Sequence, residues 1–216
     1  MKMIAFNGSP RKTWNTAMLL EKTLEGAASG GAETELVHLV DLNYQGCMSC
    51  FACRLKNGKS YGQCGLKDDL TPVLEKVQQV EALVLGTPIY LGAMSSFMQA
   101  FLERLVFPYI CYDAGYSVLF KKKIQTGLIF TMNAPEEVIE KIGYDQLFHK
   151  NQKLLARIFG FCETLIATDT YQFDDYDKYE TSGFDVEKKA RLRKELFPIA
   201  CQNAFEMGLR FIGGEK

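Results

Sequence analysis

Residues 6–16 bring together side chains of the kinds that bind phosphate. This segment follows an apolar run, residues 2–6, and precedes residues 17–28, in which apolar side chains recur at helical spacing. It therefore occupies a strand-to-helix turn, where the first free N–H groups and the positive end of the helix dipole point outward. Ser9, Thr13, Asn15 and Thr16 add short polar side chains around Arg11. The segment predicts a phosphate-binding loop, although Ser, Thr and Asn also cap ordinary helices.

The residues that are missing from this loop limit the kinds of phosphate group that it is expected to bind. A P-loop needs Gly-x4-Gly-Lys-Ser/Thr and a dinucleotide fingerprint needs three glycines, whereas this loop has only Gly8. A phosphatase loop would need a nucleophilic cysteine before the arginine, and no cysteine lies between Met1 and Gly46. Many discrete donors suit the three oxygens of a terminal phosphomonoester. The loop therefore favours a mononucleotide such as FMN.

The order of apolar segments predicts an α/β fold. Strand-like runs alternate with helical patterns, which indicates a parallel sheet covered by helices on both faces. We expect a single flavodoxin-like domain over residues 1–216, a three-layer sandwich with five strands in the order 2-1-3-4-5. The expected strands are residues 2–6, 35–40, 82–87, 125–131 and 163–168. The expected helices are residues 17–28, 69–80, 94–106, 136–159 and 186–211, the last kinked by Pro198.

A second loop, Gly86 to Met94, follows the third expected strand. In the 2-1-3-4-5 order the ligand crevice opens between the ends of the first and third strands, so the two loops should be neighbours. Pro88 fixes the turn, Tyr90 and Leu91 offer apolar area, and Gly92 allows close approach of a planar ligand. We therefore expect this loop to line a ring.

At these residues the chain resembles the NAD(P)H-dependent FMN reductases of flavodoxin-like fold, and within them the iron–sulfur flavoproteins. The resemblance rests on Gly8-Ser9-Pro10-Arg11 with Asn15-Thr16, on residues 47–69, and on Gly86-Thr87-Pro88-Ile89-Tyr90 with Gly92. It covers about residues 1–135 and weakens beyond them; residues 107–121 form a variable aromatic segment. It implies that the FMN phosphate is bound by Ser9, Arg11, Lys12, Asn15 and Thr16, and the isoalloxazine ring by Pro88, Ile89, Tyr90, Leu91 and Gly92. By the same analogy Thr131 and Asn133 complete the ribityl and ring contacts.

Four of the seven cysteines lie in an insertion of about residues 44–68. Cys47, Cys50 and Cys53 have C-x2-C-x2-C spacing, and Cys64 follows after ten more residues. Four thiolates can hold a cubane cluster. The resemblance implies such a motif next to the flavin, but with a shorter last gap. Zinc, a redox disulfide and unligated reduced thiols remain alternatives.

Composition excludes several classes of function. With 216 residues, 47% of them hydrophobic, the chain can bury one core. A net charge of −1 gives no general attraction to nucleic acid, and neither a signal-peptide pattern nor a membrane-length apolar run is present. We expect a cytoplasmic protein that binds neither nucleic acid nor membrane.

The predicted activity follows from the cofactor. FMN accepts a hydride, so the protein needs no acid–base triad. By family resemblance NAD(P)H is the donor, a small molecule or a redox protein is the acceptor, and the chain forms a homodimer or higher homo-oligomer. A pure electron carrier that does not oxidise NAD(P)H, and a regulator that senses redox state through Cys47 to Cys64, are the alternatives.

Overall fold

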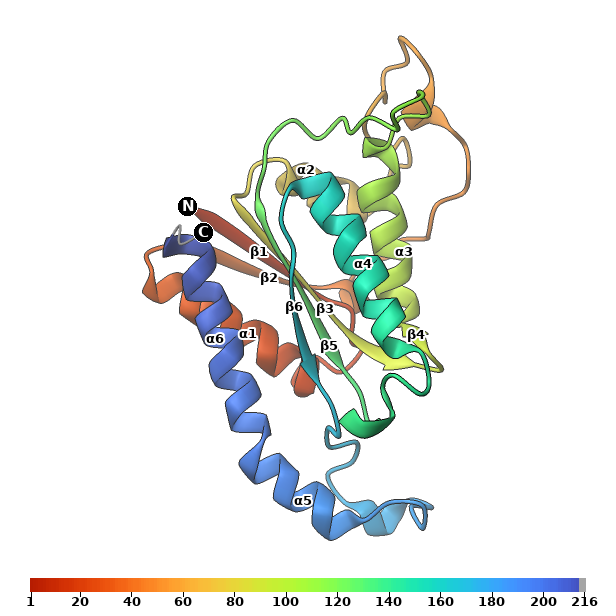
Figure 1. The fold of residues 1–216 in the computed structure, drawn as a ribbon. Helices are drawn as coiled ribbons and strands as arrows, with labels where there is room; N and C mark the ends of the chain where they lie inside the picture. The colour runs from red at the N-terminus through yellow and green to blue at the C-terminus, as the bar shows by residue number, and fades with distance from the viewer. Residues whose placement is uncertain (214–216) are drawn as a thin grey trace.

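The computed structural model describes residues 1–213 and forms three layers (Figure 1). The central parallel sheet has the order β2-β1-β3-β5-β6. Its strands are β1 (Lys2–Asn7), β2 (Glu33–His38), β3 (Ala82–Tyr90), β5 (Gln125–Thr131) and β6 (Glu163–Ala167). The two-residue strand β4 (Ala93–Met94) pairs with β3 in an antiparallel hairpin. The predicted flavodoxin-like order of five parallel strands is confirmed.

Alternate residues of the buried strands point to opposite faces of the sheet and fill two separate cores. In β1, Ile4 and Phe6 pack toward α2 (Leu70–Val77), α3 (Ser96–Val106) and α4 (Tyr144–Phe159). Met3 and Ala5 point to the other face, toward α1 (Asn15–Ser29) and α6 (Phe197–Gly213). Both faces of the central strands are therefore covered, which is why their sequences are almost continuously apolar.

Short 3-10 turns of three residues each lie in the connections between the helices and strands. They are η1 (Leu39–Asp41), η2 (Ala52–Arg54), η3 (Phe107–Tyr109), η4 (Glu136–Val138) and η5 (Tyr176–Lys178). Helix α5 (Val186–Glu195) completes the elements and extends beyond the carboxyl end of the sheet (Figure 1).

The two longest expected helices differ most from the structure. The helix expected over residues 136–159 begins only at Tyr144, because Gly143 has a left-handed backbone with φ of 75° and interrupts the coil after η4. The helix expected over residues 186–211 is two helices, α5 and α6, which meet at Leu196. Pro198 lies in the first turn of α6, where its missing N–H costs no helical hydrogen bond.

The third strand runs further than expected. It continues through Pro88 and Ile89 to Tyr90, and Pro88 pairs with Thr131 of β5. On the other side β1 ends with Asn7 opposite Gly86, so no strand there requires an N–H from Pro88. Helix α3 consequently begins later than expected, after Ser95, whose side chain caps it by accepting from the N–H of Met98.

The described residues include no helix with both the length and the apolar content needed to cross a membrane.

Candidate functional site

The loop between β1 and α1 presents unpaired amides at a helix start. The N–H groups of Asn15, Thr16 and Ala17 have no hydrogen-bond acceptor among residues 1–213, and Trp14 at the N-cap provides no side-chain cap. The first turn also contains no acidic residue. Ser9, Asn15 and Thr16 are each less than 5% exposed. This helix start can therefore satisfy its amides and its dipole by binding an anion.

The loop after β3 lies directly against this phosphate-binding loop, as the strand order predicted. Gly8 donates its N–H to the carbonyl oxygen of Gly86 at 2.8 Å. The hydroxyl of Ser95, at the start of α3, donates to the carbonyl oxygen of Gly8 at 2.6 Å. Ser95 in turn accepts from Met98, so one buried side chain joins the phosphate-binding loop to the cap of α3.

The loop after β5 completes the junction. The hydroxyls of Thr131 and Thr16 are 2.8 Å apart, which links the end of β5 to the first turn of α1. Asn133 has a buried side-chain oxygen without a hydrogen-bond partner among the described residues. A buried acceptor without a donor is costly, so this amide oxygen is suited to a ligand N–H.

The residues expected to line a ring are divided between core and surface. Pro88 and Ile89 are buried residues of β3, so they belong to the sheet and not to the predicted loop. Tyr90 and Leu91 are 46% and 105% exposed. Leu91 and Gly92 form the hairpin turn with φ values of 50° and 81°. Leucine is strained at positive φ, and strain at an exposed apolar side chain is typical of a functional position.

Several side chains of the phosphate-binding loop contact other parts of the protein. Arg11 donates from Nη1 to the carbonyl oxygen of Gln172 at 2.5 Å, and Lys12 forms a 2.8 Å ion pair with Asp41. The side-chain amide of Asn15 donates to the carbonyl oxygen of Tyr171 at 2.8 Å. Asn15 therefore offers a ligand its backbone N–H, while its side chain secures the segment after β6.

A buried polar chain behind the loop includes a histidine that the sequence did not single out as functional. Asn7 accepts from the N–H of Ser9 at 2.9 Å through Oδ1, so its Nδ2 donates to Nδ1 of His38 at 3.0 Å. Burial and the charge of Lys12 lower the pKa of His38. Neutral His38 thus orients Asn7, and Asn7 orients the amide of Ser9.

The four cysteines of the insertion line one small pocket of about 20 Å³. Cys47 and Cys50 are exposed, Cys64 is half-buried, and Cys53 is buried, which raises the pKa of its thiol. Residues 54–63 do not extend away, because they fold into successive turns and Gly62 donates its N–H to the carbonyl oxygen of Cys53 at 3.0 Å. The long gap before Cys64 is therefore compatible with a shared site.

The backbone around these cysteines has an unusual conformation. Ser49 and Phe51 both have positive φ, 53° and 55°. Left-handed residues between other conformations turn N–H groups toward one concave side, as at many iron–sulfur sites. Among the described residues no three His, Cys, Asp or Glu side chains are arranged to hold a metal ion.

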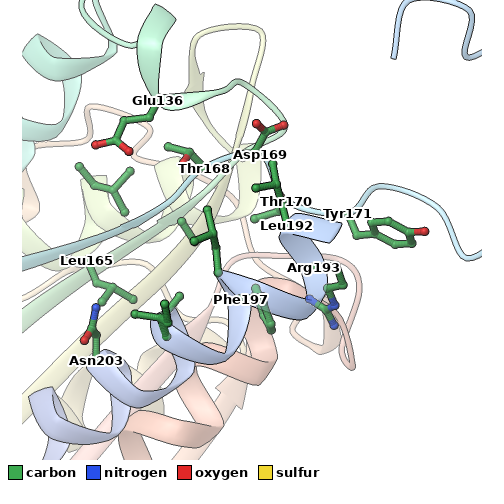
Figure 2. Close-up of a pocket in the computed structure, with 15 residues that line it drawn as sticks. Glu136, Leu165, Thr168, Asp169, Thr170, Tyr171, Leu192, Arg193, Phe197 and Asn203 are labelled. Carbon is green, nitrogen blue, oxygen red and sulfur yellow. The ribbon is translucent and has the colours of Figure 1, made fainter. Parts of the chain in front are cut away.

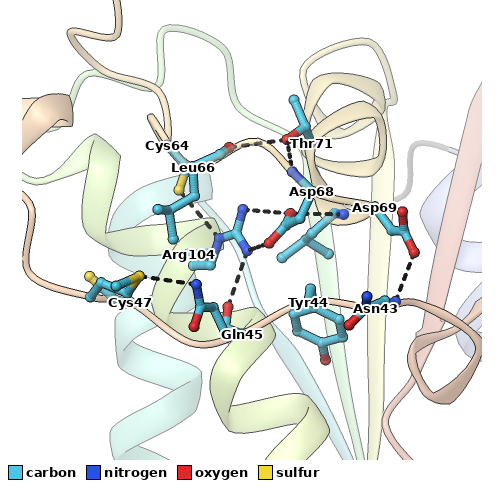
Figure 3. A network of polar contacts seen from close by, with 12 residues as sticks. Asn43, Tyr44, Gln45, Cys47, Cys64, Leu66, Asp68, Asp69, Thr71 and Arg104 are labelled. Carbon is cyan, nitrogen blue, oxygen red and sulfur yellow. Dashed lines mark hydrogen bonds and ion pairs between the residues drawn. The ribbon is translucent and has the colours of Figure 1, made fainter.

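Arg104 of α3 is one of the residues that line the cysteine pocket, and its polar contacts are drawn in Figure 3. Its guanidinium is fully buried, forms a bidentate ion pair with Asp68 and donates from Nε to the sulfur of Cys64 at 3.3 Å. Burial alone would raise the pKa of Asp68, but the hydrogen bonds and charge of Arg104 lower it. The pair fixes the insertion to the carboxyl-terminal end of α3.

Comparison with known families agrees with this geometry. Residues 1–128 match the family model described as NADPH-dependent FMN reductase. The chain belongs to this family. The match includes the loops after β1 and β3 and all four cysteines of the insertion, and ends before Thr131, Asn133 and α5.

Curated relatives are similar over about half of the chain. An iron-sulfur flavoprotein of Archaeoglobus fulgidus is 42% identical over 104 residues, which cover 48% of this chain and 48% of the relative. An iron-sulfur flavoprotein of Methanocaldococcus jannaschii is 34% identical over 104 residues, covering 48% and 51%. The chain thus spans about half the length of the curated relatives it matches.

Solved structures are similar over nearly the whole chain. An NAD(P)H:quinone oxidoreductase from Methanothermobacter marburgensis has a TM-score of 0.66 at 16% identity, covering 97% of this chain and 95% of that one. An FMN-dependent NADH-azoreductase from Bacillus anthracis, in complex with FMN, has a TM-score of 0.66 at 11% identity, covering 98% and 100%. At these identities the likeness establishes the shared fold.

A pocket of about 190 Å³ adjoins the loops of this FMN reductase-family site without being part of the predicted crevice (Figure 2). It lies between β6, α5 and α6, and its lining includes Tyr171, Arg193 and Phe197. None of the residues predicted for the cofactor lines it. The sequence carried no signal for this neighbourhood, because its residues come from beyond the family match and from no motif.

Proposed function

We propose that the chain is an oxidoreductase that binds FMN where the loops after β1, β3 and β5 meet, takes hydride from NAD(P)H and passes electrons to a small acceptor such as flavin or quinone. The observation that carries this proposal is the unpaired first turn of α1 beside Ser9 and Thr16, joined to Thr131. These amides would bind the phosphate. Bound FMN would supply the hydride chemistry.

The other loops would orient the ring. Tyr90 and Leu91 offer exposed apolar surface on a hairpin fixed by Ser95, and Asn133 offers an acceptor. A cofactor held at these three places would leave its ring edge near the protein surface, where a nicotinamide could be positioned. No charged side chain needs to move a proton for this reaction.

Phosphate contacts can be tested by comparing FMN with riboflavin. Removing Ser9 and Arg11 together (Ser9→Ala with Arg11→Ala) should weaken FMN binding by about 100-fold or more, because charge-assisted hydrogen bonds contribute about 1.5–3 kcal/mol each. Riboflavin, which has no phosphate, should lose much less. Kd values would be measured by quenching of flavin fluorescence, with Lys22→Ala on the exposed face of α1 as the control.

Unchanged FMN affinity in the double variant would contradict the proposed phosphate site. NAD(P)H oxidation by the FMN-loaded protein separates the oxidoreductase from a pure electron carrier. Bound FMN without any NAD(P)H oxidation would overturn the proposed activity while leaving the binding site in place.

A second candidate function is favoured by the cysteine pocket. Cys47, Cys50, Cys53 and Cys64 would hold an iron–sulfur cluster, which would pass single electrons to a redox protein. What supports it is the shared pocket and the left-handed residues between the cysteines. Protein purified without oxygen should then contain iron and acid-labile sulfide in matching amounts; flavin without iron would leave the first function alone.

We also propose that the chain acts as a homodimer, as the family resemblance implied. Helix α3 packs Phe101, Leu102 and Leu105 into the core of its own chain. The exposed hairpin with Tyr90 and Leu91 is therefore the better candidate for a contact between subunits. Light scattering on the purified protein measures the mass directly.

A further inference from the structure

Arg193 of α5 reaches the start of α1 from the far end of the sequence. Its Nη1 donates to Oδ1 of Asn15 at 2.8 Å, and its Nη2 lies 3.3 Å from the sulfur of Met18. The guanidinium also lies over the ring of Phe197, 3.8 Å from the centroid. Figure 2 shows Arg193 near the end of α5 and Phe197 at the start of α6. The position of this cation is therefore fixed by three different partners.

No carboxylate among the residues that the structure describes neutralises the charge of Arg193. No Asp or Glu among residues 1–213 forms an ion pair with it, and the guanidinium is partly desolvated, which lowers its pKa. Asn15 is the first residue of α1, so the cation lies beside the positive end of that helix dipole. Arg11 adds a further positive charge to the same loop.

Such an arrangement is unfavourable in the absence of an anion. A half-buried cation at a helix N-terminus is repelled by the helix dipole, whereas a negative ligand there would be attracted by both the cation and the dipole. The neighbouring Lys189 of the same helix is different, because its ammonium pairs with Asp169. Arg193 is therefore the cation of α5 whose charge a phosphate would complement.

We propose that Arg193 is a positioning residue for the FMN phosphate: it fixes the side chain of Asn15 and supplies positive charge beside the unpaired amides of α1. This inference rests on the proposed FMN site. It extends that site to α5, a helix beyond the family match and without any recognised motif.

The orientation of Asn15 gives Arg193 its indirect role. The side chain of Asn15 is held at both ends, by Arg193 at Oδ1 and by the carbonyl oxygen of Tyr171 at Nδ2. Trp14 Nε1 donates to the same carbonyl oxygen at 3.0 Å. Both ends of the side chain are thus held, and the N–H of Asn15, which has no acceptor among residues 1–213, remains available to the phosphate.

The test compares three variants with the wild-type protein. Arg193→Gln removes the charge, Arg193→Lys keeps it, and Lys194→Gln removes a charge from an exposed neighbour on the same helix. For each protein, the Kd values for FMN and for riboflavin are measured by fluorescence quenching at low and high salt. The melting temperature of the flavin-free protein is measured in parallel.

We expect Arg193→Gln to weaken FMN binding at least tenfold, to change riboflavin binding less than threefold, and to reduce the salt dependence of FMN binding. Arg193→Lys should recover part of the FMN affinity, and Lys194→Gln should match the wild type. The flavin-free Arg193→Gln protein should melt at the same or a higher temperature, because an uncompensated charge is lost.

A merely structural role for Arg193 gives a different pattern. Equal weakening of FMN and riboflavin, together with a lower melting temperature, would overturn the inference; so would an unchanged ratio of the two Kd values. If the wild-type protein binds riboflavin and FMN equally, or neither, the proposed phosphate site itself fails and the inference fails with it.

Discussion

Asn7 shows how single buried side chains prepare the phosphate-binding loop. It is fully buried at the end of β1, and its amide connects His38 on β2 to the N–H of Ser9. Each group in this chain has a defined direction, because the amide oxygen accepts from Ser9 and the amide nitrogen must then donate to His38. Only a neutral histidine can accept at Nδ1, so the loop depends on the protonation of one residue.

We therefore predict that FMN affinity falls in mild acid because His38 becomes protonated. Its pKa is lowered in the folded protein, first by burial and then by Lys12, against the opposing charges of Asp41 and Glu21. The stabilisation from neutral His38 is complete above its unfolded pKa of about 6.5 and is lost as the pH falls through the lower folded pKa. Protonated His38 would carry an N–H at Nδ1, which would face the Nδ2 donor of Asn7 and remove this hydrogen bond.

His38→Gln provides the measurement, because glutamine offers an acceptor that does not titrate. FMN binding to the wild type should weaken more between about pH 7 and pH 5 than binding to the variant, with the titration of the FMN phosphate itself, whose second pKa is about 6, common to both proteins. Identical pH dependence in the two proteins would show that His38 does not control the loop.

At the scale of elements, the helices and strands that the sequence predicted correctly are those that depend on local residue patterns. The strand expected at residues 125–131 is β5 without any change, because six of its seven residues are apolar or small and buried, which leaves little ambiguity. The strand order also predicted that the loops after β1 and β3 lie side by side, as they do. The division at Leu196 was indicated by Pro198, whereas the late start of α4 depends on the φ of Gly143, which composition alone does not reveal.

The parts of the site that the sequence did not predict are contacts between distant elements. Tyr171 and Gln172 accept from Asn15 and Arg11 through backbone carbonyl oxygens, which any residue possesses. Arg193 meets Asn15 across 178 positions. No periodicity or motif marks such pairs, because they arise only when α6 packs on α1 and brings α5 to the phosphate-binding loop.

Helices α1 and α6 approach each other closely, and two glycines make this possible. A Cβ atom at Gly26 would lie 1.9 Å from the carbonyl oxygen of Phe205, and one at Gly208 would lie 1.8 Å from that of Thr23. Neither obstacle is a flexible side chain, so an alanine would force the helices apart. The same contact carries α5 to the phosphate-binding loop.

Gly208→Ala should consequently reduce the free energy of unfolding by about 3 kcal/mol, the upper part of the range for overpacked cores. An alanine in an open helical position normally gains up to about 1 kcal/mol over glycine. Gly213→Ala is therefore the control at the end of the same helix, since no atom of the described residues, apart from the adjoining chain, lies within 4 Å of a Cβ there. Urea denaturation measures both variants, and equal stability would contradict the close contact of α1 with α6.

At the scale of the whole molecule, helix α3 separates the two candidate redox sites. Ser95 at its start joins the predicted FMN loops, whereas Glu103 and Arg104 near its end contact Cys47 and Cys64. With a rise of 1.5 Å per residue, the nine steps along the helix from Ser95 to Arg104 span about 14 Å. In one chain the cysteine pocket therefore lies at the opposite end of α3 from the predicted FMN loops.

This separation predicts that the two sites can be removed independently. Cys50→Ser changes an exposed side chain in the cysteine pocket and should abolish any iron and sulfide of protein purified without oxygen. Its Kd for FMN should stay within about twofold of the wild type, because a change of 0.4 kcal/mol or less is expected for a surface substitution far from the site. The double variant Ser9→Ala with Arg11→Ala should show the reverse, with weak FMN binding and unchanged iron. A large loss of FMN affinity in Cys50→Ser would mean that the cysteine segment contacts a flavin after all, and in an assembly of two chains that flavin would belong to the neighbouring subunit.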